Sequence, residues 1–461
     1  MSVVIELQDT RGIDSQSTIN QPLDLGQDQQ IESVAQHALP PVDRGRQAWL
    51  FLAAVTTIET LIWGLPFSVG ILHAYWINTL FVGAGASTVT LAATLQTGLL
   101  YMSCAAFGPL FAAFPRWQKA IQFAGLMAAS ISMISSAFAS KPWHLVVTIG
   151  FLYPLSGACY LPCATLLFEW FHARRGLASG IMYAGTGVGG TIFPFIMSAL
   201  LNKVGYKAAM ISLGIGIGIL GSVALIPIRR RVPLSRYDHM QSGRRRRTLN
   251  WQLLKSTTMF IGVMTILLTS LGNFVPSLWL PSYANDLNLS KPNGTALIAL
   301  LNAASIPGNA LIGLLSDCLS LRAVILISCI GSSLSCAFLW GFGTNTAMLV
   351  AFVIIFGLLG LSFSALWSKM IGTIASKSLI LFHQPLDDPI APTLIFSIFA
   401  FTRGIGNITS GPISESLLKH SSFRGASGAY GFNNYGILLI YTAITILGGG
   451  VMGVMFKERR T

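Results

Sequence analysis

The chain has 461 residues, of which 53% are hydrophobic and only 10% are charged. So few charged residues cannot cover the surface of a soluble protein of this size, and the composition excludes an ordinary soluble fold. The net charge of +13 is high enough for nucleic-acid binding, but the placement of the basic residues favours a membrane protein, and we predict no nucleic-acid partner.

Residues 1–46 are polar and contain six acidic side chains in their first 32 positions. They lack the short apolar core of a cleavable secretory signal. We therefore predict a disordered cytoplasmic tail, followed by a first crossing that acts as an uncleaved insertion signal.

Apolar stretches long enough to cross a bilayer recur twelve times. A helix needs about 20 apolar residues to span the hydrocarbon core. The stretches are 47–72, 88–112, 119–140, 143–168, 177–201, 207–228, 256–281, 295–315, 322–341, 346–368, 390–413 and 433–455. The sequence thus predicts an all-α membrane protein with twelve transmembrane helices.

The basic residues indicate the orientation of these helices. With both termini placed inside, 22 of the 29 Lys and Arg residues fall on the inner face, six fall in outer loops, and Arg403 falls within a helix. Cationic loops are retained on the cytoplasmic side, so this bias predicts a multi-pass protein of the plasma membrane with both termini in the cytoplasm.

The longest inner connection, 229–255, carries two runs of arginine and divides the helices into two sets of six. We predict an N-terminal bundle at 47–228, a basic cytoplasmic linker at 229–255, a C-terminal bundle at 256–455 and a cytoplasmic tail at 456–461. Two such halves place a solute site between them near mid-depth.

One outer loop contains two acceptor sequences for N-glycosylation, at Asn288 and Asn293. Both face outward in the predicted topology, so glycosylation is chemically possible in a secretory-pathway host. Because the loop is short, the sequence favours neither the glycosylated nor the unmodified form of these two asparagines.

Glycines follow one another closely in the fifth helix. The run Gly185-Thr-Gly187-Val-Gly189-Gly190 matches a dinucleotide-binding pattern, but no strand precedes it and it lies inside an apolar helix. We assign Gly180, Gly185 and Gly189 to close helix packing, since small residues let membrane helices approach. We predict no cofactor and no metal.

Two charged residues lie near the middle of predicted helices, Glu59 in the first and Arg403 in the eleventh. Each is costly in bare lipid, so each must face a hydrated cavity or a partner. A carboxylate at this depth can take up a proton, whereas arginine stays charged and suits an anionic solute. The alternatives are a purely structural ion pair or capping hydrogen bonds within the bundle.

Other polar residues are weaker candidates. Lys369 ends the tenth helix and can reach the inner surface by snorkelling, so a role in substrate or proton binding is less favoured there. Asn309 and Tyr153 can offer hydrogen bonds within a cavity, or can be satisfied inside the bundle. Glu169 ends the fourth helix near Arg174 and Arg175. We predict that these three residues form an ion-pair gate at the inner face.

No catalytic grouping is present in the sequence. We find no His-rich cluster, no Ser-His-Asp candidate and no phosphate-binding Gly-Lys-Ser/Thr run. The sequence therefore argues against an enzyme and against an ATP-driven pump.

Three segments resemble the monocarboxylate carriers and their fungal relatives. The run Asp43 to Trp49 is similar, in degraded form, to the motif before their first helix. The run Phe168 to Gly185 resembles the fungal relatives between helices four and five, and Arg403 to Pro412 resembles them in helix eleven. The resemblance spans nearly everything after residue 40 and implies the major facilitator fold, with two six-helix halves and alternating access.

The chain also departs from that family. Phe67 stands where the animal carriers have a lysine that engages the carboxylate, and Ser305 and Asn309 lie where they have an Asp/Arg pair. Simple lactate–proton symport is therefore not expected. The fungal relatives carry acids, vitamins or secondary metabolites, so the resemblance leaves the substrate open.

These features predict a monomeric secondary transporter that moves a small organic solute, a weak acid or a secondary metabolite, across the lipid bilayer. Proton coupling through Glu59 is one option. The alternatives are an efflux pump of a biosynthetic pathway and a nutrient receptor that kept the carrier fold without transport. Solute flux in a reconstituted preparation separates a carrier from a receptor.

Overall fold

The computed structural model describes residues 40–82, 85–232, 256–289, 294–382, 390–420, 423 and 425–456. The chain divides into two units, Met1–Pro40 and Pro41–Thr461, and the described helices belong to the second. Most of the predicted N-terminal tail, most of the basic linker, Asn293 and the end of the C-terminal tail lie outside the described residues.

The first half of the second unit is helical throughout. Short π or 3₁₀ segments join several of its helices, and their names begin with η. The elements are α2 (Arg46–Tyr75), η1 (Trp76–Leu80), α3 (Ala86–Ala113), η2 (Pro115–Trp117), α4 (Gln118–Ser136), α5 (Pro142–Leu145), η3 (Val146–Leu152), η4 (Tyr153–Ser156), α6 (Gly157–Trp170) and α7 (Arg175–Leu225).

The second half has the same character. Its elements are α10 (Thr257–Asn273), α11 (Val275–Asp286), α12 (Gly294–Cys318), α13 (Leu321–Leu334), η5 (Ser335–Trp340), α14 (Thr346–Leu359), η6 (Leu361–Leu366), α15 (Trp367–Phe382), α16 (Ile390–Leu418), η7 (Gly428–Gly431) and α17 (Tyr435–Val454). The described residues contain no strand. The predicted all-α class is confirmed.

The helices match the predicted crossings. Nine helical stretches within the described residues are long and apolar enough to span a membrane. One of them, α7, is 51 residues long and joins two predicted crossings across Gly205, whose φ of 77° and ψ of 171° break the helix. The crossings predicted at 119–140 and 390–413 correspond to α4 and α16, which are not among these nine stretches.

Side chains at the starts of three helices explain locally why they begin there. Ser256 accepts a hydrogen bond from the Met259 N–H at 3.2 Å in α10. Asn345 accepts one from the Met348 N–H at 2.9 Å in α14, and Ser320 caps α13 in the same way. Each cap satisfies a backbone donor that the first helical turn leaves without a partner.

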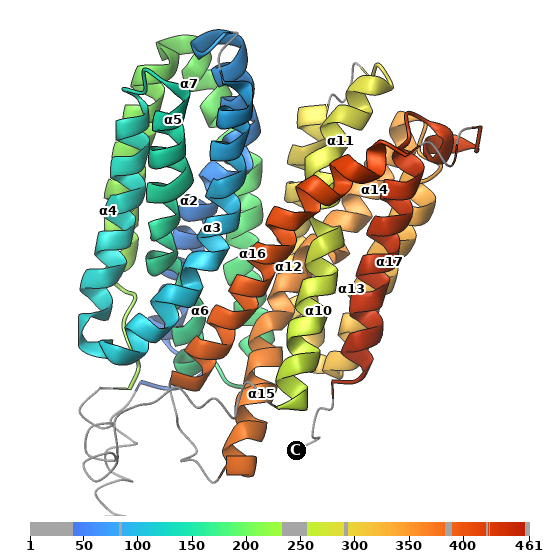
Figure 1. The fold of residues 1–461 in the computed structure, drawn as a ribbon. Helices are drawn as coiled ribbons and strands as arrows, with labels where there is room; N and C mark the ends of the chain where they lie inside the picture. The colour runs from blue at the N-terminus through green and yellow to red at the C-terminus, as the bar shows by residue number, and fades with distance from the viewer. Residues whose placement is uncertain are drawn as a thin grey trace, which may run out of the picture. The chain divides into compact units, whose positions relative to one another are not determined.

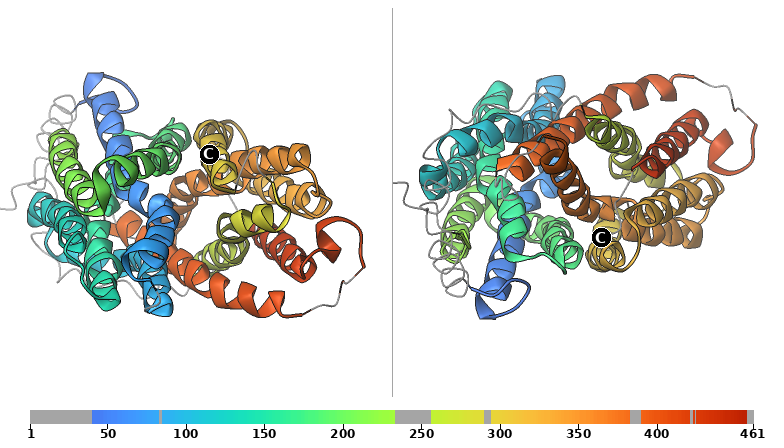
Figure 2. Two further views of the ribbon diagram at one scale, coloured as in Figure 1. Left: turned by 90° about the horizontal axis from the view of Figure 1, so that it is seen from above. Right: turned by 90° about the horizontal axis from the view of Figure 1, so that it is seen from below.

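The helices of the two halves meet along two seams. Figure 1 shows α2 to α7 gathered on one side and α10, α11, α13, α14 and α17 on the other, with α12 and α16 along the junction. The same division is seen along the bundle axis in Figure 2. Helix α7 packs against α12, and α3 packs against α16. These two seams bring together segments far apart in the chain, and a site between the halves is lined from both.

Candidate functional site

A pocket lies between the halves; the space free of atoms within its outline is about 520 Å³ and includes open solvent. Its walls come from α2, α3, α6 and α7 of the first half and from α12, η6, α15 and α16 of the second. The lining residues are Trp63, Phe67, Tyr101, Tyr160, Tyr183, Thr186, Gly187, Asn302, Ser305, Asn309, Leu361, Ser364, Trp367 and Arg403.

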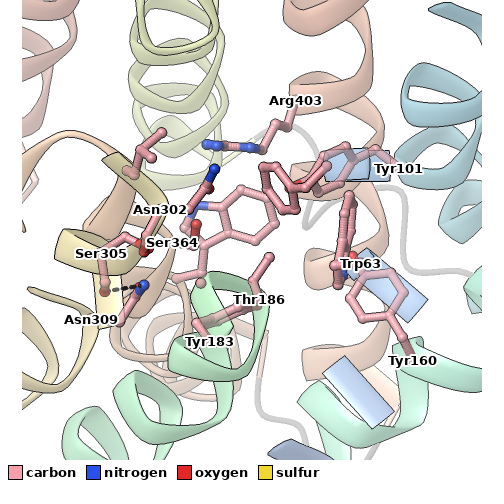
Figure 3. A pocket seen from close by; sticks show the side chains of 14 residues that line it. Trp63, Tyr101, Tyr160, Tyr183, Thr186, Asn302, Ser305, Asn309, Ser364 and Arg403 are labelled. Carbon is pink, nitrogen blue, oxygen red and sulfur yellow. Dashed lines mark hydrogen bonds between the residues drawn. The ribbon is translucent and has the colours of Figure 1, made fainter. Parts of the chain in front are cut away.

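Arg403 projects into this cavity from α16 (Figure 3). Its side chain is 9% exposed, and neither Nε nor Nη1 has a hydrogen-bond partner within the described part of the chain. The guanidinium carbon lies 5.6 Å from the ring centroid of Tyr101 and 5.8 Å from that of Trp367. Both distances permit a cation–π attraction, which partly offsets the loss of hydration.

The opposite wall is uncharged and polar. Figure 3 shows Asn302, Ser305 and Asn309 on one side of the cavity and Trp63, Tyr101 and Tyr160 on the other. Asn309 donates from Nδ2 to the Ser305 carbonyl oxygen at 2.8 Å, and its Oδ1 is buried without a partner in the described residues. Asn309 can therefore accept a hydrogen bond from a bound molecule.

Glu59 lies close behind the cavity wall and does not line it. It is fully buried in α2, one turn before Trp63, and neither carboxylate oxygen meets a partner in hydrogen-bonding geometry among the described residues. The described part of the chain shows no ion pair between Glu59 and Arg403. The structural pair considered as an alternative is thus not formed in this conformation.

Tyr153 does not reach the cavity. Its hydroxyl donates to the Ile62 carbonyl oxygen in α2 at 2.6 Å, and both groups are buried. Pro66 follows Ile62 by four residues and has no N–H, so the α2 ladder leaves this carbonyl without its usual donor. Tyr153 satisfies an acceptor that the proline has freed.

Tyr153→Phe is therefore expected to destabilise the protein while leaving transport nearly unchanged. An unsatisfied buried carbonyl costs about 1–3 kcal/mol, which thermal unfolding in detergent will report as a lower Tm. Tyr160→Phe is the matched control for stability alone, because no backbone carbonyl among the described residues accepts a hydrogen bond from the Tyr160 hydroxyl and its removal therefore strands no such acceptor. An unchanged Tm for Tyr153→Phe would contradict this structural role.

The end of the bundle near Asp43, Glu169 and Asp317 is the inner end in the predicted orientation. Here Asp317 of α12 accepts hydrogen bonds from the Gly176 and Leu177 backbone N–H groups, each at 2.8 Å. These donors belong to the first turn of α7, where the helix dipole favours a carboxylate. The second half thereby caps a helix of the first. Asp317 is not among the site residues predicted from the sequence.

Lys369 lies beside this cap. Its Nζ donates to the Ser316 carbonyl oxygen in α12, and the Lys369 charge acts on the Asp317 carboxylate. Both contacts are with the second half, and Lys369 is not among the residues that line the cavity. The structure places it at the inner end.

The predicted grouping of Glu169 with Arg174 and Arg175 is not found. The Glu169 carboxylate lies 3.5 Å from Arg230 and accepts from the Arg231 N–H at 3.0 Å. Arg175 donates from Nε to the Phe171 carbonyl oxygen at 3.3 Å, and its guanidinium stacks on Phe168. Glu169 holds the segment after α7 to the end of α6, within the first half.

Arg174 is engaged through its backbone instead. Asp43 accepts hydrogen bonds from the N–H groups of His172, Ala173 and Arg174, at 3.0, 2.9 and 2.9 Å. Burial raises the pKa of Asp43, but the three backbone donors outweigh burial and the net pKa is lowered. Asp43 is thus an ionised tether between the start of α2 and the loop that precedes α7.

The three glycines predicted to mediate packing lie on two faces of α7. A Cβ on Gly180 would overlap the Asn309 carbonyl oxygen of α12. A Cβ on Gly185 would overlap the Thr56 carbonyl oxygen of α2, and one on Gly189 would lie 2.6 Å from that of Thr60. Only glycine allows these backbones to approach so closely.

Asn288 is exposed at the end of α11 and has a φ of 56°. In Figure 1 this end of α11 lies opposite the inner end. The described residues contain no group of three or more His, Cys, Asp or Glu side chains that could hold a metal ion.

Comparisons with known proteins point to one family. The sequence profile of the Major Facilitator Superfamily matches residues 67–378. The chain is 26% identical to the MFS-type transporter pytF of Aspergillus terreus over 63% of this chain and 96% of that protein. It is 24% identical to the MFS-type transporter pynF of Aspergillus niger over 89% of this chain and 90% of that one. It is 25% identical to the aspyridones efflux protein apdF of Emericella nidulans, over 69% and 63% of the two chains.

Proposed function

The chain belongs to the Major Facilitator Superfamily and is a multi-pass membrane transporter, and from that premise we propose that it carries a small organic anion by alternating access, with Arg403 as the anion site. One observation carries this proposal. Arg403 is a permanent cation near mid-depth, in a cavity lined by both halves, and its Nε and Nη1 have no hydrogen-bond partner among the described residues. A buried cation in this setting favours a ligand with negative charge and paired oxygen acceptors.

The contacts at the inner end support alternating access. The Asp317 cap on α7 joins the halves there, and a Cβ on Gly108 of α3 would overlap Ser397 of α16. These contacts close the inner side of the seams while the cavity lies toward mid-depth. We propose that the solute is released on one face when these contacts hold and is bound from the other when they part.

Glu59 is the proposed proton site. An ionised carboxylate is costly in this buried position, so Glu59 favours the neutral form until a hydrated path or a cation reaches it. Its place close behind the cavity wall, one turn from Trp63, supports coupling between proton and solute.

We propose export as the direction of transport, a monomer as the working unit and the plasma membrane as its location, with both termini in the cytoplasm. One relative is named as an efflux protein, and the excess of Lys and Arg on predicted inner loops supports the orientation.

The test is uptake and release of labelled cinnamate and octanoate in proteoliposomes at neutral pH, with protein-free liposomes as the background. The wild type should exchange at least one acid above background and accumulate it when a pH gradient is imposed. Glu59→Gln should retain exchange but lose the accumulation, because the side chain keeps its shape and cannot titrate. If neither acid moves faster than in protein-free liposomes, the carrier function is wrong; if Glu59→Gln still accumulates solute, the proton role is wrong.

A further inference from the structure

Among the unpartnered buried polar atoms of the cavity wall, donors outnumber acceptors. Four lining residues carry buried polar atoms without partners in the described part of the chain: Nε and Nη1 of Arg403, Nε1 of Trp367, the hydroxyl of Tyr160, and Oδ1 of Asn309. Nearly all buried polar atoms in folded proteins are paired. A bound solute can complete these contacts, and to do so it needs several acceptor oxygens and one donor.

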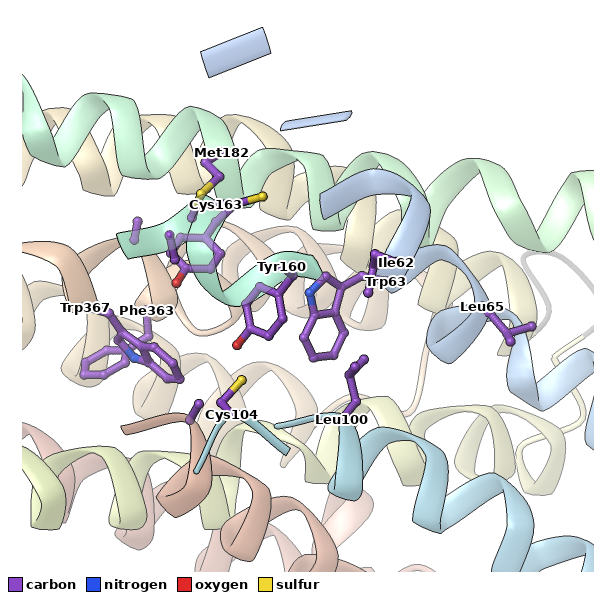
Figure 4. Packing of buried hydrophobic residues seen from close by; sticks show 14 of the residues in the cluster. Ile62, Trp63, Leu65, Leu100, Cys104, Tyr160, Cys163, Met182, Phe363 and Trp367 are labelled. Atoms are coloured by element: carbon purple, nitrogen blue, oxygen red, sulfur yellow. The ribbon is translucent and has the colours of Figure 1, made fainter. Parts of the chain in front are cut away.

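The cavity is also walled by aromatic rings. Six of its fourteen lining residues are aromatic, and they come from both halves. Trp63 packs on Tyr101 with ring centroids 4.5 Å apart, and Tyr183 meets Trp367 edge-on at 6.5 Å. Figure 4 shows Tyr160 beside Trp63, with Cys104 near its hydroxyl end. Aromatic faces and edges recognise another flat π-system better than a saturated chain of similar size.

The charge of the lining residues narrows the class of ligand further. None of the lining residues is acidic, so nothing in the wall balances a cationic solute. Arg403, held between Tyr101 and Trp367, presents a planar guanidinium. A planar oxyanion that pairs with it can extend its conjugated body along the same aromatic rings.

We propose that the solute is a planar conjugated organic acid: an aromatic or conjugated body with an ionised oxygen group at Arg403 and a hydrogen-bond donor at its far end for Asn309. This inference names the substrate class of the proposed anion carrier and rests on that function. A short aliphatic acid would occupy Arg403 and leave Trp367, Tyr160 and Asn309 without partners.

Four matched probes test the class by thermal stabilisation of the purified protein in detergent. 4-Hydroxycinnamate carries every feature; cinnamate lacks the donor, 3-cyclohexylpropanoate lacks the flat ring, and 4-hydroxycinnamyl alcohol lacks the anion. We expect 4-hydroxycinnamate to bind about tenfold more tightly than the saturated acid and than the alcohol, and a few-fold more tightly than cinnamate.

Substitutions in the cavity wall assign each difference in probe affinity to a residue. Trp367→Leu should remove most of the preference for the flat ring, and Asn309→Ala should remove the advantage of the hydroxyl. Trp143→Leu is the control, because Trp143 is 55% exposed in α5 and lies away from the cavity. Trp367→Phe keeps an aromatic ring and should retain the preference for the flat ligand. It controls for a folding defect caused by substitution at this position.

Equal or tighter binding of the saturated acid would overturn the aromatic class, as would a ring preference that survives Trp367→Leu. Flux measurements separate this failure from that of the carrier itself. Transport of 3-cyclohexylpropanoate in proteoliposomes at the rate of 4-hydroxycinnamate would remove only the substrate class. No flux of either acid would remove the carrier function and the inference with it.

Discussion

Arg403→Ala should lower the apparent affinity for an organic anion about 100-fold and abolish measurable transport at low solute concentration. A charge-assisted hydrogen bond contributes about 1.5–3 kcal/mol, and Arg403 can offer two, from its unpartnered Nε and Nη1. Arg403→Lys keeps the charge but loses the paired geometry, so it should retain part of the affinity. The measurement is concentration-dependent uptake of 4-hydroxycinnamate into proteoliposomes.

Stability separates a binding role from a structural one. A buried guanidinium with unpaired donors is a cost to the folded protein, so Arg403→Met should raise Tm while transport falls. Arg116→Ala is the control, because Arg116 is an exposed cation in η2, away from the cavity. Unchanged uptake by a correctly inserted Arg403→Ala would remove this residue from the mechanism, and a lower Tm for Arg403→Met would assign it to structure.

The depth of these side chains could be predicted from the sequence, whereas their direction could not. Hydrophobic length places Glu59 and Arg403 near mid-membrane, and Arg403 lines the cavity. Glu59 is not among the lining residues. Which face of a helix meets the cavity depends on how neighbouring helices pack, and a nearly uniform apolar stretch carries little signal about its inward face.

Partners that are distant in the chain were the least predictable. The sequence leaves open whether Tyr153 lines the cavity or is satisfied within the bundle; its hydroxyl donates to the Ile62 carbonyl oxygen, 91 positions earlier. Pro66 indicates that the Ile62 carbonyl oxygen lacks its helical donor, but it does not indicate which side chain donates to that oxygen instead. Asp317 was missed for a similar reason: its partners are backbone N–H groups of α7, 140 positions away, and backbone donors leave no trace in the sequence.

The glycines of α7 could be assigned to packing, but their division between two neighbours required the structure. Gly185 meets α2, whereas Gly187 meets Asn302 and Ser305 of α12. Two residues turn a helix by roughly 200°, so adjacent glycines of the same motif serve opposite faces. The same helix can therefore pack firmly within its half and slide against the other.

Gly180→Ala is expected to prevent tight closure of the inner end. The added Cβ would overlap the Asn309 carbonyl oxygen, which is backbone and cannot swing aside. Overpacking of this kind costs about 1–3 kcal/mol, and because the contact joins the two halves, the cost applies only to the state in which the inner seam is closed. That penalty shifts the equilibrium between the two states roughly 10- to 100-fold toward inner opening.

Two measurements follow that shift. Transport of 4-hydroxycinnamate should fall about tenfold or more, and a cysteine introduced by Ser316→Cys, which is fully buried in the closed seam, should react faster with a thiol reagent. Gly216→Ala is the matched control, since Gly216 lies in the same helix with no atom within 4 Å of an added Cβ; it should leave both readouts unchanged. Wild-type transport together with unchanged labelling in Gly180→Ala would show that α7 and α12 need not approach this closely, and that closure depends on the Asp317 cap or on the α3–α16 seam instead.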